Sequence, residues 1–65
     1  MATDNLAKKA LRYILDYRYQ NFDYPSNQHM AEVMGGSNNW GNYRRRLFDD
    51  GKLIESDIDD FQVPD

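Results

Sequence analysis

The feature that most constrains this chain is a glycine pair, Gly35-Gly36, between two segments whose apolar residues recur at helical spacing. The first segment, NQHMAEVM, spans residues 27–34, and the second spans about residues 38–50. Glycine readily adopts the left-handed backbone on which many helices end, so the pair predicts a sharp stop after the first segment. The sequence therefore predicts two short helices joined by a tight turn.

A longer helix is predicted upstream, over about residues 4–22, because apolar residues there share one helical face. These residues are Ala7, Ala10, Leu11, Ile14 and Leu15. Pro25 disfavours helical backbone at Tyr24, and Ser26 is a good N-cap for the helix over 27–34. We therefore expect the first two helices to be separated by a short proline-containing turn.

The C-terminal part of the chain changes period. Leu53 and Ile54, and then Phe61 and Val63, flank the polar sequence SDIDD, which predicts a small β-hairpin over about residues 52–63. An isolated hairpin is marginal in water, so it must pack against the helices. The expected fold is a mainly α domain with a small β-hairpin.

The chain has 65 residues, which predicts a single domain over residues 1–65. A domain of this size buries only about 60% of its unfolded surface, so nearly all large apolar residues must share one core. The expected core residues are Leu11, Ile14, Leu15, Ala31, Met34, Trp40, Leu47 and Phe48.

Composition narrows the functional classes. The chain has no cysteine, so neither a disulfide nor a thiolate metal site is possible. No apolar run approaches the roughly 20 residues of a membrane span, and the N-terminus lacks the apolar region of a signal peptide. We expect a cytoplasmic protein without a membrane partner.

The predicted order of helix, helix, tight turn, helix and hairpin is that of a winged helix-turn-helix. The stretch from ALRYIL to GKLIE resembles the N-terminal DNA-binding domain of LexA-type repressors. The residues that match this family's turns, inner positions and wing start are Pro25, Ala31, Gly35, Leu47, Gly51, Ile54 and Glu55. The resemblance implies that the helix over 38–50 is a recognition helix for DNA.

Several positions depart from this family. The glycine turn is shorter and the start of the wing, GKLIE, is longer. Trp40 stands where the family has a small residue, and Arg44 stands where it has an apolar one. Winged helices also serve as protein-binding modules, so the resemblance implies a scaffold more firmly than a function.

The third predicted helix has a polar face opposite Trp40 and Leu47, at about 100° per residue. Asparagine makes paired hydrogen bonds to adenine and arginine to guanine, and recognition helices contact bases mainly through their N-terminal half. The predicted base contacts are Asn38, Asn39, Asn42 and Arg45, with Arg46 at bases or phosphate. A merely solvated face is the other interpretation of these residues.

Contacts to the DNA backbone are predicted at the start of the second helix, from Ser26, Asn27 and Gln28. Gly41, within the third helix, lowers helix propensity by about 1 kcal/mol relative to alanine. Either a close approach to DNA or room for a neighbouring aromatic ring explains it.

The charge distribution argues against DNA on the wing. The chain carries a net charge of −3, and its acidic residues crowd the C-terminal end, including Asp57, Asp59 and Asp60 at the expected wing tip. These carboxylates would repel phosphate. Ile58 among them is either a protein contact or part of the core.

The aromatic residues of the first helix also leave two interpretations open. The set is Tyr13, Tyr17, Tyr19, Phe22 and Tyr24. Tyrosine and arginine are enriched at protein interfaces, so a homodimer through this helix is possible. The tyrosines could equally cover the edge of the core.

Nothing in the sequence favours catalysis: His29 is the lone histidine, and no phosphate-binding glycine loop is present. We therefore expect no enzyme activity, no cofactor and no metal. The predicted function is a small sequence-specific protein that binds double-stranded DNA, a phage or prokaryotic transcriptional regulator. The alternative is a protein-binding winged helix, an inhibitor or anti-repressor, using the acidic wing and the tyrosines of the first helix.

Overall fold

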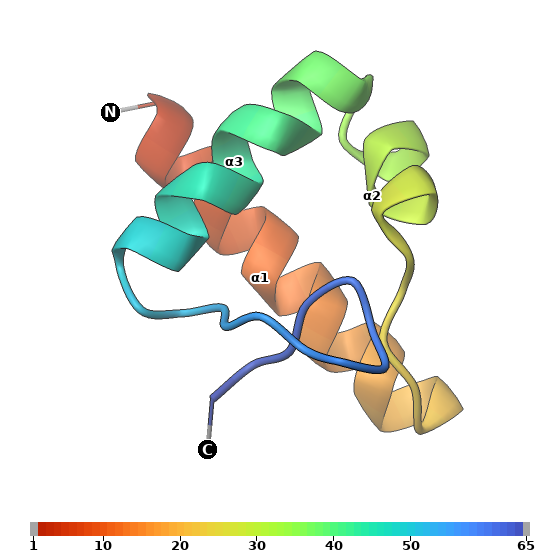
Figure 1. Ribbon diagram of the computed structural model, residues 1–65. Coiled ribbons are helices and arrows are strands. Elements are labelled where there is room, and N and C mark those ends of the chain that lie inside the picture. Colours follow the sequence, from red (N-terminus) through yellow and green to blue (C-terminus); the bar gives the residue numbers. More distant parts are fainter. Residues whose placement is uncertain (1, 65) are drawn as a thin grey trace.

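The computed structural model describes residues 2–64 of the chain. Within them lie three helices, α1 (Ala2–Asn21), α2 (Asn27–Val33) and α3 (Ser37–Asp49). Figure 1 shows α3 crossing the N-terminal half of α1, with α2 beside both and the C-terminal segment below. The prediction of a mainly helical chain is confirmed, and each helix lies close to its predicted range.

The first helix packs through small and branched residues. Ala7, Ala10 and Ile14 are fully buried, so the apolar face of α1 is largely as predicted. Leu15 was expected in the core and is instead 43% exposed. The prediction is wrong because Leu15 is 100° round from Ile14 and lines a surface groove with Tyr19 and Phe22 instead.

The end of α1 has an unusual backbone. Phe22 adopts a left-handed conformation with φ of 58°, and its amide donates to the carbonyl of Arg18 at 2.8 Å. Glycine usually occupies this position, because a side chain there strains the backbone. Phe22 is 92% exposed, so its ring does not pack in the core.

The turn between α2 and α3 follows the prediction from the glycine pair. Gly35 and Gly36 have φ of 88° and 130°, both unfavourable for other residues. The amide of Gly36 donates to the carbonyl of Ala31 at 2.7 Å, and the Asn39 side-chain amide donates to the carbonyl of Gly35 at 3.3 Å. The first bond satisfies a carbonyl that the end of α2 leaves unpaired, and the second ties the turn to the start of α3.

The predicted β-hairpin over 52–63 is not seen. Among the described residues, pairing there is limited to one antiparallel bridge, in which Ile54 and Gln62 exchange backbone hydrogen bonds of 2.8 and 2.9 Å. Between them, the Ser56 hydroxyl accepts from the amides of Ile58 and Asp59. Such local bonds compete with a strand ladder, so the segment forms a loop closed by a bridge.

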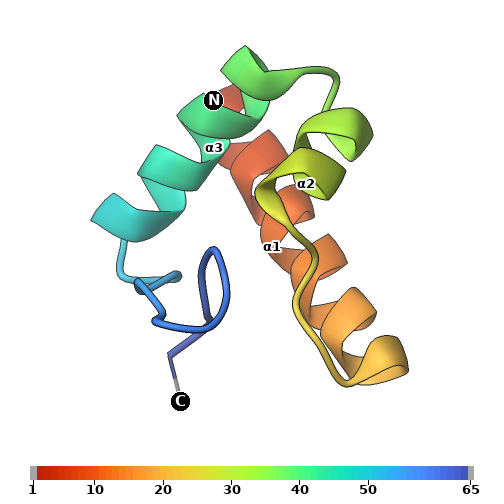
Figure 2. The ribbon, with the colours of Figure 1, turned by 45° about the vertical axis from the view of Figure 1, so that its right-hand side comes forward.

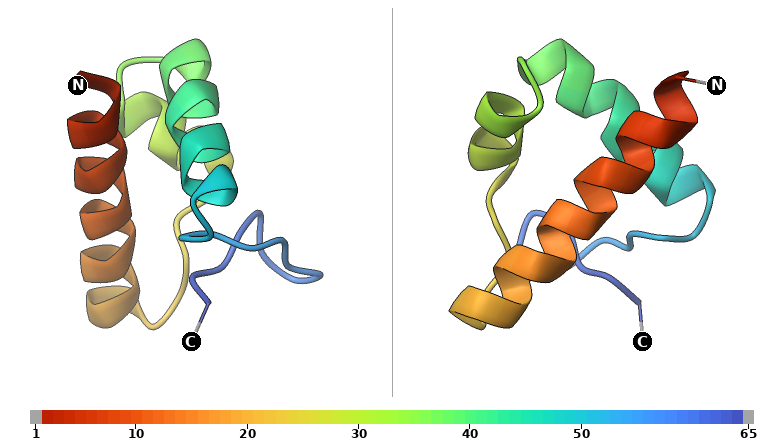
Figure 3. Two further views of the ribbon diagram at one scale, coloured as in Figure 1. Left: turned by 90° about the vertical axis from the view of Figure 1, so that its left-hand side faces the viewer. Right: turned by 180° about the vertical axis from the view of Figure 1, so that it is seen from behind.

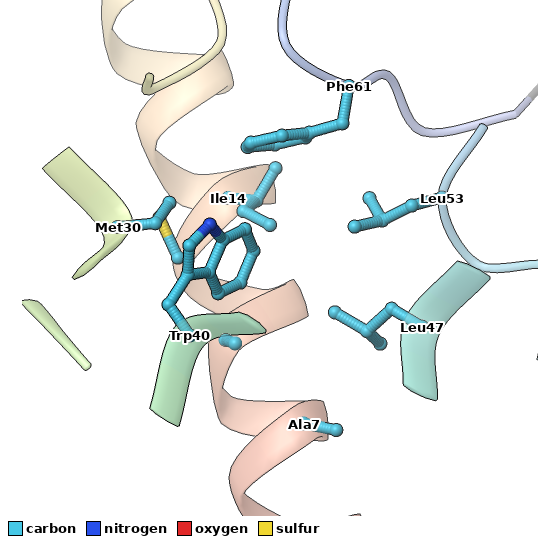
Figure 4. Close-up of a cluster of buried hydrophobic side chains, with 8 residues drawn as sticks. Ala7, Ile14, Met30, Trp40, Leu47, Leu53 and Phe61 are labelled. Atoms are coloured by element: carbon cyan, nitrogen blue, oxygen red, sulfur yellow. The ribbon is translucent and has the colours of Figure 1, made fainter. Parts of the chain in front are cut away.

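The core brings together all three helices and this loop. Phe61 lies over Ile14 and Trp40, and Leu53 faces the same cluster beside Leu47 (Figure 4). The Phe61 and Trp40 ring centroids are 5.6 Å apart. The predicted core residues that are partly buried against this cluster are Leu11, Ala31, Met34 and Phe48. Met30, Leu53 and Phe61 are fully buried core residues that the expected core did not include.

Candidate nucleic-acid interface

The helix α3 has one buried and one exposed face. Trp40 and Leu47 are 3% and 2% exposed and hold the helix against the core. The outer side of α3 is not covered by another element (Figure 2). The predicted DNA-contacting residues of this helix are all exposed: Asn38, Asn39, Asn42, Arg45 and Arg46.

These five side chains differ in how they are held. Asn39 is bonded to the turn, and the Arg46 Nε donates to the Asp50 carboxylate at 3.1 Å. In contrast, Asn38, Asn42 and Arg45 have no hydrogen-bond or ion-pair partner among residues 2–64. Their donors and acceptors are therefore available to a ligand on the outer face of α3.

Trp40 fixes the position of this face. Its indole Nε1 donates to the Asn27 side-chain oxygen at 3.0 Å, so a buried donor is satisfied at the start of α2. A buried indole N–H without a partner would cost about 1–3 kcal/mol. The tryptophan that departs from the LexA-type pattern thus joins α3 to α2 in this chain.

The start of α2 is largely engaged inside the protein. The Ser26 hydroxyl accepts from the His29 amide at 3.1 Å and caps the helix as predicted. The backbone amide of Asn27 donates to the Asp60 carboxylate at 2.8 Å. Of the three residues predicted to contact phosphate, Gln28 is exposed. The backbone amide of Asn27 is bonded to Asp60, and its side-chain oxygen is bonded to Trp40.

The third arginine of the cluster lies away from the outer face. The Arg44 guanidinium carbon is 4.5 Å from the centre of the Phe48 ring, and its Nη2 donates to the Asp60 carbonyl at 3.3 Å. Arg44 therefore anchors the C-terminal loop to α3. Asp60 is itself exposed, and it joins that loop to the helices, since both its carbonyl and its carboxylate accept bonds from them.

The lone histidine of the chain, His29, packs against α1. Its ring is half-buried between two α1 aromatics, with ring centroids 5.8 Å from Tyr13 and 5.1 Å from Tyr17. The Tyr13 hydroxyl and the His29 Nε2 share a hydrogen bond of 2.7 Å. Two tyrosines one helical turn apart were the available signal, because they form a single surface for a ring on α2.

No protein-family model matches this chain, and comparisons with curated proteins and with solved structures give no match. Over residues 2–64, no three histidine, cysteine or acidic side chains gather in a way that could hold a metal ion. No helix in that range is both long enough and apolar enough to cross a membrane.

Proposed function

We propose that this chain is a small sequence-specific DNA-binding protein, a phage or prokaryotic transcriptional regulator that reads the major groove with α3. The observation that carries the proposal is the outer face of α3. Asn38, Asn42 and Arg45 are exposed there without partners among the residues that the structure describes, while Trp40 and Leu47 fix the opposite face in the core.

The dimensions and chemistry of this face suit duplex DNA. An α-helix with its side chains is about 10–12 Å across, and the major groove is about 12 Å wide. Asn38 and Asn42 are one turn apart and can each pair with an adenine, and Arg45 can pair with a guanine. Ser26, Gln28 and the remaining amide donors of Asn27 would contact phosphate from α2, with Arg46 at the edge of the helix.

The acidic C-terminal loop meets the predicted phosphate contacts at Asn27, whose backbone amide donates to the Asp60 carboxylate at 2.8 Å, and this carboxylate would repel a phosphate there. The rest of the loop does not oppose DNA at the start of α3. It lies at the far end of the molecule from the start of α3 in two views (Figures 1 and 2). Screening limits the field of its carboxylates to about 10 Å at 0.1 M salt. In a winged-helix interpretation, this loop stands in the place of the wing and would point away from the bases that α3 reads.

A matched pair of arginine variants tests the proposal. A preferred duplex is first selected from a random library with the parent protein. We expect Arg45→Ala to weaken binding to that site by about 1–3 kcal/mol, or roughly 5- to 150-fold in Kd, and to relax its sequence preference. Arg12→Ala removes the same charge from α1 and should preserve the preference. Equal effects of the two variants would contradict base reading by α3.

A second candidate function is protein binding, and the exposed aromatics favour it. Tyr19 and Phe22 at the end of α1 are 85% and 92% exposed, and Leu15 lies beside them on the same groove. Ile58 on the acidic loop is 86% exposed. A protein partner, or a second copy forming a homodimer through α1, would remove this apolar surface from water.

The strained backbone at Phe22 supplies a clean test of this candidate. Phe22→Gly removes the exposed ring and relieves the left-handed strain, so the variant keeps its fold. If α1 mediates a homodimer, sedimentation equilibrium should show the parent associating at concentrations where the variant is a monomer. Identical monomeric behaviour of both proteins would rule out a homodimer through this surface.

A further inference from the structure

Two exposed apolar surfaces lie on different elements of this molecule. The first is a surface groove of about 580 Å³ on the last turns of α1, hereafter the α1 groove, lined by Leu15, Arg18, Tyr19 and Phe22. The second is Ile58, which is 86% exposed on the acidic loop, residues 55–60. None of the apolar side chains of these two surfaces belongs to the core or packs against it. Folding of the single chain therefore leaves both surfaces open to water.

We infer that the acidic loop of one copy of this chain docks into the α1 groove of a second copy, with Ile58 entering the groove. The contact is heterologous, because a different surface of each copy takes part. Each copy keeps one free groove or one free loop, so the copies join head to tail. This inference rests on the second candidate function, protein binding, and is independent of DNA binding by α3.

The α1 groove contains an exposed aromatic ring at a strained backbone position. Phe22 has φ of 58° and is 92% exposed. Glycine would relieve the strain there, and the ring does not pack in the core, so the fold of the single chain does not account for a phenylalanine. Strained residues of this kind cluster at sites that clamp a ligand. A contact that buries the ring accounts for this residue.

The acidic loop is held in one shape on both sides of its isoleucine. The Ser56 hydroxyl accepts from the amides of Ile58 and Asp59 at 3.2 and 3.1 Å. Beyond them, Asp60 is bonded to the helices and Phe61 is fully buried. A loop that is ordered before it binds loses less conformational entropy on association. Ile58 is therefore presented to a partner at little cost.

The α1 groove of the same molecule is not in contact with Ile58. Its side chain lines a separate depression with Glu55, Ser56, Asp57 and Gln62, which shares no residue with the α1 groove. In the left-hand view of Figure 3, the C-terminal loop, drawn in blue, extends away from α1. The loop that fills the groove must therefore come from another copy of the chain.

The charge distribution favours this contact over a symmetrical contact between two α1 helices. Residues 5–21 of α1 contain four basic side chains and one acidic side chain, whereas residues 55–60 contain four acidic side chains and no basic one. A symmetrical contact would bring two positively charged helices together. A contact between loop and groove instead brings opposite charges together, which favours this pairing over its competitor.

Arg18 and Asp57 can form an ion pair between the two copies. The Arg18 guanidinium carbon is 5.1 Å from the centre of the Tyr24 ring, and this side chain has no ion-pair partner among residues 2–64. Asp57 directly precedes Ile58, is exposed, and has no hydrogen-bond or ion-pair partner in the same range. The guanidinium can therefore donate to this carboxylate while Ile58 occupies the groove.

A mixing experiment with two complementary variants tests the inference. Phe22→Gly removes the ring from the groove, and Ile58→Ser removes the apolar side chain from the loop. From the burial of one such side chain, each variant alone should self-associate about 10- to 150-fold more weakly than the parent in sedimentation velocity. An equimolar mixture pairs the intact groove of one variant with the intact loop of the other. The mixture should form 1:1 dimers with the affinity of the parent, and no larger species.

Two controls accompany the mixture. Val33→Ser removes a branched side chain that is 41% exposed on α2, outside both surfaces, and should associate as the parent does. Circular dichroism on every variant verifies that it is folded. High salt should weaken the association of the parent, because the contact joins opposite charges and salt screens them.

The outcomes separate this contact from the second candidate function. If the parent associates and the mixture associates no better than each variant alone, the contact between loop and groove is overturned. If Ile58→Ser associates as strongly as the parent, the contact is likewise overturned, and a symmetrical contact through α1 replaces it. If the parent remains a monomer up to about 1 mM, both the head-to-tail contact and a homodimer are overturned. None of these results bears on DNA binding by α3.

Discussion

Two regions of this molecule contribute to the same core by different means. The two-helix segment, residues 27–49, is organised by local bonds, including the Ser26 cap and the bonds of the glycine turn. The C-terminal segment, residues 52–64, has little regular structure and is held by distant contacts. Its Asp60 binds the Asn27 amide, and its Val63 amide donates to the Tyr24 hydroxyl at 3.1 Å.

The difference shows that regular secondary structure is not needed for a large share of the packing. Phe61, in a loop, is 0% exposed, whereas Val33, in α2, is 41% exposed. In so small a domain the buried area is limited, so one well-placed aromatic can matter more than a turn of helix. The C-terminal segment therefore also holds α3 in position, through Phe61 against Trp40 and through the Asp60 carbonyl, which accepts from Arg44.

The largest effect on the free energy of unfolding is expected at Phe61. Phe61→Ala removes a fully buried ring against Trp40 and should reduce the free energy of unfolding by about 3–5 kcal/mol. Urea unfolding followed by Trp40 fluorescence measures the loss. Ile58→Ala, in the same loop but exposed, should change stability by less than about 0.5 kcal/mol. Similar values for the two variants would show that the loop does not support the core.

A smaller effect is expected where the two regions meet, at Asn27. Asn27→Ala leaves the Trp40 indole donor without its acceptor and should cost about 1–3 kcal/mol. Asn27→Asp keeps an acceptor oxygen at the same place and should restore part of that stability. Asn42→Ala, on the exposed face of α3, serves as the control. Thermal unfolding of the three variants under one buffer condition gives the comparison, and an unchanged midpoint for Asn27→Ala would contradict the account.

The smallest effect concerns Gly41 and separates stability from binding. A Cβ built there meets no atom within 4 Å, so the glycine is not making room for a neighbouring side chain. Gly41→Ala should therefore stabilise the protein by about 0.5–1 kcal/mol through helix propensity. If DNA approaches α3 closely, the same variant should bind its selected duplex more weakly. Tighter or equal binding would show that the backbone of Gly41 is not near DNA.

The helices were predictable from the sequence because their signals are local. Helical spacing in α1, the Ser26 cap and the Gly35-Gly36 stop each act within a few residues of where they lie. The exposed face of α3 follows from the same periodicity once Trp40 and Leu47 are taken as buried. This part of the candidate site needed no knowledge of the remaining chain.

The remaining features of the fold and of the candidate site depend on contacts between residues that are far apart in the sequence. The alternation of residues 52–63 predicts that Phe61 is a strand residue. No local pattern shows that the core needs an aromatic ring beside Ile14 and Trp40. The engagement of Asn27 by Trp40 and Asp60 joins residues 13 and 33 positions apart.

The measurement that tests the central claim most directly is an NMR titration of labelled protein with a mixed-sequence duplex at low salt. If α3 reads DNA, the backbone amide shifts should concentrate at residues 26–28 and 38–46 and should disappear as salt concentration rises. Shifts confined to the end of α1 and to the acidic loop, or no shifts at all, would contradict DNA binding by α3. In that case the search would move to protein partners of Tyr19, Phe22 and Ile58.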